Sequence, residues 1–180
     1  MEGKSETQKE IFYTALYHSL LNPNLYVDVD GHYNGTDLQK HHTDDKHYTI
    51  FSLWDTFRAT HPLFTLIQQE RTNEFIRTFL RQYKEGGQLP IWELAANYTG
   101  CMIGYHAIPV IADAYVKGIR DYDADLALEA MVHSAMQDDL GLSWYKKNGF
   151  IAASDEPESV SKNLEYAYDD WCIALLADSL

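Results

Sequence analysis

The sequence predicts an all-α fold built from paired antiparallel helices. Hydrophobic residues recur at helical spacing along most of the chain, and six such stretches are bounded by residues that commonly begin or end helices. Six helices make roughly three antiparallel pairs. With 180 residues, of which 46% are hydrophobic, the chain has enough apolar surface for one buried core. The stretch at about 24–50 departs from the helical pattern.

The first two helical stretches have clear start and stop signals. Ser5 and Gln8 form a capping-box pattern, and the first helix stops at "NPN", residues 22–24. Ser52 is placed to cap "LWDTFRAT", and Pro62 predicts that a new helical turn begins there, so this segment is kinked or split. The expected apolar face of the first helix consists of Ile11, Phe12, Ala15, Leu16 and Leu20.

The third and fourth helices carry the most apolar residues. Thr72 is placed to cap the third, which ends at Gly86-Gly87. The fourth is expected at about 101–117, bent by Pro109, and its apolar residues surround the helix axis, so we expect it to be buried. The apolar stripe of the third helix consists of Phe75, Ile76, Phe79, Leu80 and Tyr83.

Two further helices complete the predicted array. Asp123 opens the fifth, which we expect to end near Gly141, and the sixth runs from about Ser159 to Ser179. The inward residues expected in the fifth are Leu126, Ala127, Ala130, Met131, Ser134 and Ala135. The packing face expected in the sixth consists of Leu164, Ala167, Tyr168, Trp171, Cys172, Leu175 and Leu176.

The segment at about 24–50 reads as an ordered insertion, either a polar loop or a small hairpin. Long loops in compact domains are usually functional or disordered, and the alternation in "LYVDV" and "HYTIF" is compatible with strands. "DVDG" resembles the start of a calcium loop but lacks the later ligands. Two interpretations remain open for the side chains of His41, His42, Asp44 and His47: a transition-metal site or a solvated loop.

Charge and hydropathy exclude two classes of partner. A net charge of -13 disfavours nucleic acid, whose binding requires Lys and Arg against phosphates. No apolar run approaches the roughly 18 residues needed to cross a bilayer, so we expect no membrane span. Cys101 and Cys172 both lie in apolar stretches, where a thiol packs as a small hydrophobic group.

Carboxylates and aromatic residues occur together at the ends of the predicted helices. Asp55 follows Trp54, Glu93 follows Trp92, and Glu165 lies among the aromatic residues of the last helix. Sugars are bound by aromatic faces that cover C–H surfaces and by acids that take hydroxyls, and glycoside hydrolysis needs a pair of acids. The alternative is that the aromatics belong to the core and the acids are caps or ion-pair partners.

Four long blocks resemble a known family. They are "FYTALYHSLL", "FSLWDTFRATHPLFTLI", "LPIWELAANYTGCMIGYHAIPVIADAYVKGIRDYD" and "SVSKNLEYAYDDWCIALLADSL". In this order, from about Lys9 to Leu180, they resemble the catalytic domain of glycoside hydrolase family 92, calcium-dependent exo-acting α-mannosidases of the α-1,2 type. The resemblance implies that residues 1–180 are part of an α/α toroid of paired helices.

The same resemblance implies an incomplete enzyme. Family members are much longer and are often exported, periplasmic or at the bacterial cell surface, which leaves the location of this chain open. The block that carries their general base has no counterpart here, so the sequence resembles an excised segment or truncated gene product. Half a toroid would leave inner helices without neighbours, so we expect exposed apolar surface, covered by self-association or by the missing remainder.

The resemblance also implies a set of site residues. The family hydrolyses α-mannoside glycans with inversion, and calcium is implied as its cofactor, although this chain alone need not bind it. The family's acid stands where this chain has Tyr98. The substrate-binding residues carried over are Trp54, Asp55, Arg58, Trp92, Thr99 and Glu165. Because acid and base are missing, we expect no hydrolysis by the isolated chain, and the alternative is a non-catalytic helical module that binds sugar or is only structural.

Overall fold

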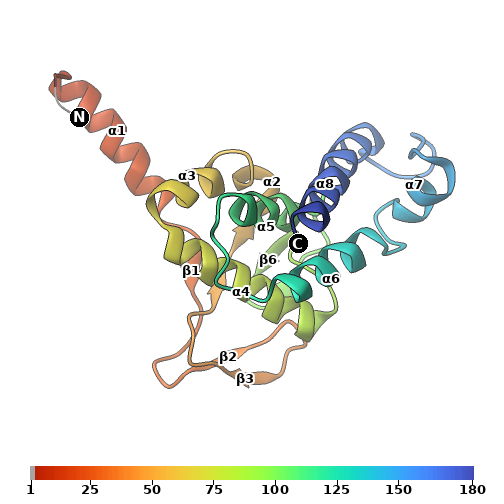
Figure 1. Ribbon diagram of the computed structural model, residues 1–180, viewed down its shortest axis with the longest axis horizontal. Helices are drawn as coiled ribbons and strands as arrows, with labels where there is room; N and C mark the ends of the chain where they lie inside the picture. The colour runs from red at the N-terminus through yellow and green to blue at the C-terminus, as the bar shows by residue number, and fades with distance from the viewer. Residues whose placement is uncertain (1–2) are drawn as a thin grey trace.

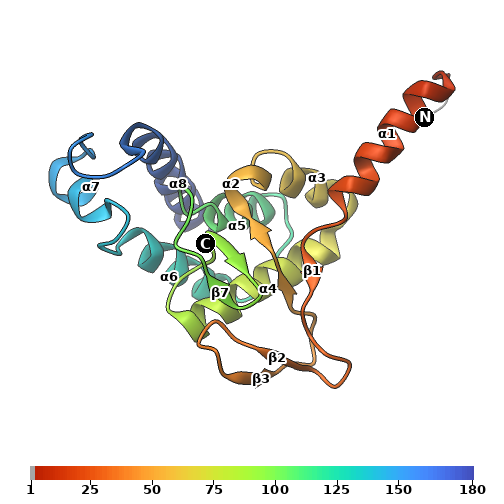
Figure 2. The same ribbon diagram turned by 180° about the vertical axis from the view of Figure 1, so that it is seen from behind.

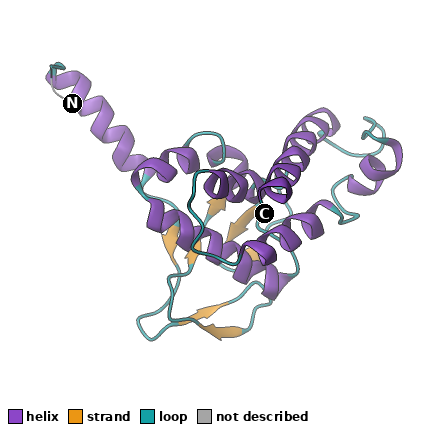
Figure 3. Cartoon of the chain, viewed as in Figure 1, coloured by secondary structure: helices purple, strands orange, loops and turns teal. Residues whose placement is uncertain are grey.

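The computed structural model describes residues 3–180 as a mainly helical chain (Figure 3). The all-α class predicted from hydrophobic spacing is confirmed, with helices separated by short strands. The helices are α1 (Glu6–Ser19), α2 (Leu53–Thr56), α3 (Thr60–Ile67), α4 (Gln69–Gly86), α5 (Ala107–Val116), α6 (Ala124–Ala135), α7 (Leu142–Asn148) and α8 (Ser159–Ser179). The closed toroid stays a prediction.

Seven short strands form three small antiparallel sheets. β1 pairs with β4, β2 with β3, and β6 lies between β5 and β7. The first two sheets lie in the predicted insertion, which contains the β2–β3 hairpin, and the third is a feature that helical spacing could not reveal (Figure 2). The strands are β1 (Asn24–Leu25), β2 (His32–Asn34), β3 (Lys40–His42), β4 (Tyr48–Thr49), β5 (Phe51–Ser52), β6 (Trp92–Leu94) and β7 (Asn97–Tyr98).

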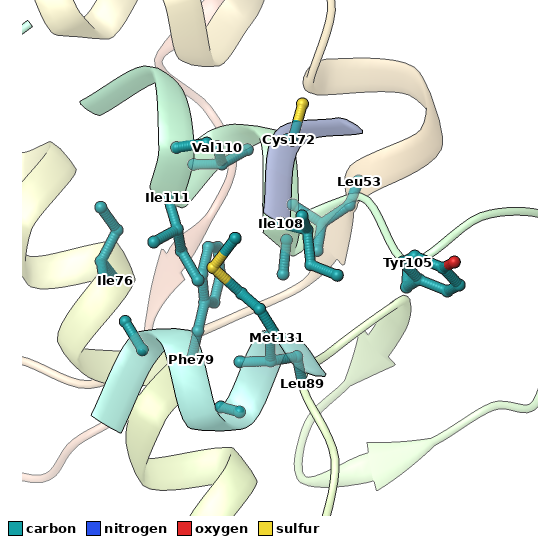
Figure 4. Close-up of a cluster of buried hydrophobic side chains, with 14 of the residues drawn as sticks. Leu53, Ile76, Phe79, Leu89, Tyr105, Ile108, Val110, Ile111, Met131 and Cys172 are labelled. Atoms are coloured by element: carbon teal, nitrogen blue, oxygen red, sulfur yellow. The ribbon is translucent and has the colours of Figure 1, made fainter. Parts of the chain in front are cut away.

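Helix α5 is the centre of the core, as its all-round apolar sequence predicts. It packs against α3, α4 and α8 (Figure 1), and Ile108 and Ile111 are fully buried. The helix begins at Ala107 rather than at about Cys101, so Pro109 lies in its first turn, where an N–H has no helical partner to lose. Figure 4 shows the apolar cluster around α5, to which α4 contributes Phe79 and α6 contributes Met131.

Several predicted boundaries require correction. Helix α4 begins at Gln69, and Thr72 lies inside it, where its Oγ1 donates to the carbonyl of Gln68 at 3.1 Å instead of capping the helix. Helix α6 ends at Ala135, and Gly141, read as its end, has φ 84° and precedes the unpredicted α7. Ser52 caps nothing, because its hydroxyl donates to Asp55 Oδ2 at 2.6 Å.

Helix α1 projects away from the rest of the molecule (Figures 1 and 2). The predicted capping box is confirmed: the Ser5 hydroxyl accepts from the Gln8 N–H, and the Gln8 side chain accepts from the Ser5 N–H. None of the residues of α1 is buried, and Ile11 is 66% exposed. The apolar face was predicted to pack, but only its last residue, Leu20, packs against the core, whereas Ile11, Phe12 and Ala15 are exposed.

Helix α8 buries a different face from the one predicted. Leu164 and Trp171 are exposed, whereas Tyr166, Asp169 and Cys172 are buried. The helix carries apolar residues on two sides. Hydrophobicity and the polar partners of Lys162 and Asp169 together determine which side faces inward. Periodicity alone cannot register such partners. Cys172 is buried as predicted.

Cys101 departs from the prediction. It is exposed on the loop before α5, although it was expected to pack as a small hydrophobic residue. This loop contains three residues with positive φ, Gly100, Met102 and Gly104, so the backbone turns where a continuous helix was expected. The apolar residues around Cys101 in the sequence therefore did not predict that its thiol is exposed.

The insertion is fastened to α4 by ion pairs and is held together internally by aromatic stacking. Asp45 accepts from Arg77 Nε at 2.6 Å and from Arg81 Nη1 at 3.2 Å. Tyr33 stacks on His47 with ring centroids 3.9 Å apart. The histidines do not form the suggested metal site: between residues 3 and 180, no three His, Cys, Asp or Glu side chains gather so as to hold a metal ion. In the same part of the chain, no helix is long and apolar enough to cross a membrane.

His61 makes a pH dependence of stability testable. It is fully buried beside Phe75, and burial lowers the pKa of its imidazole to about 4. Because the unfolded ring titrates near 6.5, stability from this group is present above that pH and is lost as pH falls toward 4. The free energy of unfolding should fall by about 3 kcal/mol over this range.

Chemical denaturation measured at several pH values checks this. The variant His61→Phe should lose that part of the pH dependence, whereas His18→Phe, at an exposed histidine of α1, should keep it. If the free energy of unfolding of His61→Phe depends on pH as strongly as that of the unmodified chain, other groups cause the dependence.

Candidate functional site

The three-stranded sheet brings together several residues that the sequence singled out. Ser52 of β5 pairs with Trp92 of β6, and Glu93 of β6 pairs with Tyr98 of β7. Thr99 follows directly, and its Oγ1 donates to the carbonyl of Trp92 at 2.6 Å. Since paired residues share a face and successive residues alternate, Tyr98 lies on the Glu93 face of the sheet and Trp92 on the other.

The turn between β6 and β7 has a strained backbone. Ala95 and Ala96 have φ values of 48° and 67°, the pattern of a type I′ hairpin turn, which normally takes Asn and Gly. A left-handed conformation costs a residue with a Cβ about 1 to 2 kcal/mol. The turn is held by hydrogen bonds from the N–H of Ala95 to Thr49 Oγ1 at 2.6 Å and from the N–H of Ala96 to Glu93 Oε1 at 2.7 Å.

Glu93 is the buried centre of these contacts. Its Oε1 also accepts from Thr49 Oγ1 at 2.8 Å, and its Oε2 accepts from the N–H of Ile50 at 3.1 Å. Burial raises the pKa of this carboxyl above its ordinary value, while the hydrogen bonds oppose the rise. Both oxygens of Glu93 accept hydrogen bonds from the protein itself. Glu93 therefore links the insertion to the hairpin and does not take the place of the family's acid.

Tyr98 lines a small cavity. The cavity has a volume of about 60 Å³, and its walls include Gln82, Glu93 and Tyr98. Gln82 is buried, and neither atom of its amide has a hydrogen-bond partner. Partial burial, reinforced by the Asp139 carboxylate, raises the pKa of Tyr98 to about 12. At neutral pH the phenol therefore keeps its proton and serves as a hydrogen-bond donor.

A second group of predicted residues follows β5 directly, in and after α2. Asp55 is exposed, and Trp54 is half-buried with an indole N–H that has no partner. Arg58 Nη2 donates to the carbonyl of Trp54 at 3.1 Å, and the guanidinium lies 4.8 Å from the ring centre of Phe57. Arg58 is thereby directed toward α8, where its Nη2 lies 3.8 Å from Glu165 Oε1.

Arg58 and Glu165 line an open groove of about 420 Å³. Tyr168 forms part of the same groove and stacks with Trp171, the ring centroids lying 6.2 Å apart. An aromatic face beside a carboxylate and a guanidinium suits a sugar, because the ring covers C–H surface while the charged groups take hydroxyls. The complete lining is Phe57, Arg58, Pro62, Pro109, Asp113, Glu165 and Tyr168.

Behind this groove lies a buried histidine that sequence reasoning missed. His106 Nδ1 lies 2.9 Å from Asp169 Oδ1, and its Nε2 lies 3.1 Å from Glu165 Oε2. The ring is fully buried, and Phe57 stacks on it at 4.0 Å. The available signal was Glu165 and Asp169 four residues apart on one helix, which places two carboxylates on one face. His106 lies 63 residues away from Asp169 in the sequence, so no local pattern identifies it as the partner of these carboxylates.

Asp169 is the most deeply placed acid of this cluster. Its Oδ2 accepts from the N–H of Tyr105 at 2.8 Å. Burial raises the pKa of Asp169, and the contact with His106 opposes the rise. The carboxylate thus joins the start of α5 to the middle of α8.

The predicted residues therefore divide between two connected places. Trp92, Tyr98 and Thr99 belong to the sheet, with Tyr98 at the small cavity, whereas Arg58 and Glu165 face the groove. Calcium, expected from the resemblance, requires six to eight oxygen ligands. The described residues offer no group of three acidic, His or Cys side chains for a metal, and Glu165 already faces Arg58 and His106. These residues do not fit a calcium site by themselves.

Comparison with known proteins gives consistent matches along the chain. The model of the glycosyl hydrolase family 92 catalytic domain matches residues 1–180. A family GH92 α-mannosidase from Bacteroides thetaiotaomicron is 44% identical with a TM-score of 0.92, over 96% of this chain and 24% of its own. It has also been solved in complex with mannoimidazole.

Two further relatives also match nearly the whole chain. A family GH92 inverting mannosidase from Bacteroides thetaiotaomicron VPI-5482 is 38% identical with a TM-score of 0.90, over 99% of this chain and 26% of its own. An uncharacterised secreted glycosidase from Arthroderma benhamiae is 28% identical over 99% of this chain and 21% of its own length. The chain thus spans about a quarter or less of these proteins.

The role of Glu93 can be tested with the isosteric variant Glu93→Gln. Both carboxylate oxygens accept from backbone N–H groups, so an amide must turn its NH₂ toward a donor. We expect a loss of about 2 to 3 kcal/mol in the free energy of unfolding, measured by chemical denaturation. Glu10→Gln, at an exposed position of α1, is the matched control and should change little. Equal stability of the two variants would contradict the role given to Glu93.

Proposed function

This chain belongs to glycosyl hydrolase family 92, and we propose on that basis that it forms the part of an α-mannosidase catalytic domain that holds the mannoside. The observation that carries the proposal is the groove in which Arg58 and Glu165 lie beside an aromatic wall. It is supported by a relative that was solved with mannoimidazole. The whole protein's activity toward α-mannoside glycans is part of the same proposal.

The groove supplies complementary groups for a sugar. Glu165 accepts hydrogen bonds from hydroxyls, and Arg58 donates to ring or hydroxyl oxygens. Tyr168, with Trp171 stacked behind it, offers a face for the C–H surface of a pyranose. Asp113 lines the same groove, but Lys117 Nζ donates to it at 2.6 Å, so it is less available for a ligand.

The proposed reaction of the complete domain is hydrolysis with inversion. An acid protonates the leaving oxygen while a carboxylate activates water on the opposite face of the sugar. At the expected acid position this chain carries Tyr98, whose pKa of about 12 lies far above neutral pH. Efficient acids have a pKa near the working pH, so the phenol does not replace the acid. We therefore propose that this chain binds mannosides without hydrolysing them.

A non-catalytic module is the second candidate, and Tyr98 is the observation that favours it. Such a module would retain the groove as a sugar-binding surface, or would only support neighbouring elements. Binding of a simple mannoside distinguishes these two forms, because a structural module has no reason to keep the groove selective.

Binding through the groove is tested by titrating the chain with methyl α-mannoside, monitored by NMR. Glu165→Ala should weaken binding by about tenfold or more, since it removes a charged hydrogen-bond acceptor. Asp178→Ala, at an exposed position near the end of the same helix, should leave binding unchanged. Equal binding by the two variants would move the sugar site away from the groove.

The acid position is tested by grafting this segment into the 44%-identical α-mannosidase from Bacteroides thetaiotaomicron. Changing Tyr98→Glu should raise turnover of an ordinary α-mannoside by about 10²- to 10⁴-fold, because acid assistance typically contributes that much. A mannoside whose leaving group needs no protonation should gain far less.

Tyr98→Phe in the same graft is the control for changes in packing. It should remain as inactive as the Tyr98 form, because neither side chain supplies a proton near neutral pH. Equal gains on both substrates with Tyr98→Glu, or no gain, would mean that position 98 is not the acid position.

A further inference from the structure

We propose that His106 is the positioning residue of the groove: held by Asp169, it fixes the carboxylate of Glu165 in the orientation that receives a sugar hydroxyl. The proposal rests on the proposed function, because it assumes that the groove takes α-mannosides. It assigns a role to a buried side chain that makes no contact with the open groove itself.

Neighbouring side chains enclose the ring of His106. The ring is fully buried at the start of α5, and Phe57 covers one face in parallel at 4.0 Å. Asp169 lies beside Nδ1 on one side, and Glu165 lies near Nε2 on the other. A ring so confined by α8 and by the residues after α2 has a single orientation.

Both nitrogens of the His106 ring face a carboxylate. Ionised carboxylates only accept, so a ring nitrogen that faces one must donate, and a ring that donates from both nitrogens is an imidazolium. The contact of Nδ1 with Asp169 is a well-aligned hydrogen bond of 2.9 Å, and Asp169 is itself anchored by the N–H of Tyr105 at 2.8 Å. The ring orientation is therefore set from the Asp169 side, and Nε2 is left pointing toward Glu165.

Nε2 of His106 has no hydrogen-bond partner. It lies 3.1 Å from Glu165 Oε2, close enough for an ion pair, yet the alignment falls short of a hydrogen bond. A buried polar atom without a partner costs about 1 to 3 kcal/mol. A small rotation of Glu165, while its second oxygen accepts a sugar hydroxyl, would supply that hydrogen bond.

Charges on the other elements around the ring explain why Glu165 needs to be held. Arg58, after α2, lies 3.8 Å from Glu165 Oε1 and draws the carboxylate out along the groove. Asp113 of α5 lines the groove opposite, and Asp170 of α8 is engaged by the Tyr105 hydroxyl at 2.6 Å. Without a donor at Nε2, Glu165 would pair with Arg58, and both groups would be less available to the sugar.

Packing alone does not account for a histidine here. A phenylalanine would fill the same space and stack on Phe57, without two polar atoms to remove from water. The cost of burying the two nitrogens is offset only if they interact with Asp169 and Glu165. The ring is thus a link between a buried acid and an acid at the ligand surface.

Two substitutions separate the functions of the two nitrogens. In His106→Asn the amide nitrogen can take the place of Nδ1 and keep the contact with Asp169, while the donor toward Glu165 is lost. In His106→Gln the longer side chain can place its nitrogen near Nε2 and keep the donor toward Glu165. Both lose the ring that stacks on Phe57, so each is the control for the other.

The test is titration of the full chain and both variants with methyl α-mannoside, together with thermal unfolding. We expect His106→Asn to bind about tenfold more weakly than His106→Gln, because only the latter holds Glu165. In a Glu165→Ala background, which has no acceptor at this position, the difference should disappear. Equal binding by the two variants at comparable stability would overturn the proposal and leave His106 a packing residue.

Crystal structures of the two variants give a readout that does not depend on binding. Glu165 should keep its orientation in His106→Gln and turn to Arg58 in His106→Asn. If the unmodified chain does not bind methyl α-mannoside, the proposed function fails while this comparison still decides whether His106 positions Glu165. An unchanged Glu165 in His106→Asn would overturn the positioning role.

Discussion

The buried carboxylate of Glu93 is the interaction on which the sheet and its neighbours depend. One side chain accepts hydrogen bonds from Thr49 and Ile50 at the end of the insertion and from Ala96 at the hairpin tip. It compensates the backbone cost of two alanines with positive φ and fixes the register of β6 against β5. Because β5 runs directly into α2, the same carboxylate also fixes where the groove begins.

This connection couples the two parts of the candidate site. Ser52 pairs with Trp92 in the sheet, and the next residue, Leu53, is fully buried as the first residue of α2. Arg58 then follows within one helical turn of the end of α2 and meets Glu165 across the groove. Tyr98 of β7 is joined to β5 through β6, and the groove begins just after β5, so a displacement of β5 would alter both the surroundings of Tyr98 and the groups that line the groove.

Local signals predicted much of the local structure correctly, although Ser52 and Thr72 do not cap helices as expected, and pairings between residues far apart in the sequence could not be predicted from them. The capping box at Ser5, the cap at Asp123 and the apolar stripe with Phe75 rest on residues within a few positions of each other. Strands of two or three residues show no period, so β5–β6–β7 could not be predicted. Arg58 and Glu165 were identified through the family resemblance, whereas His106 has partners about 60 residues away and was missed.

The register of the hairpin explains what a tyrosine at position 98 changes. Position 98 lies directly opposite Glu93, and directly opposed residues on a sheet have Cβ atoms about 4.5 to 5.5 Å apart. A glutamate at 98 would face a second, buried carboxylate, and like charges at that range raise a pKa. That is the shift a general acid needs in order to keep its proton near neutral pH. Tyr98 avoids this charge pair and keeps a hydrogen-bond donor at the same place. The hairpin therefore keeps its geometry, while under the proposed mechanism position 98 holds a proton too firmly to act as the acid.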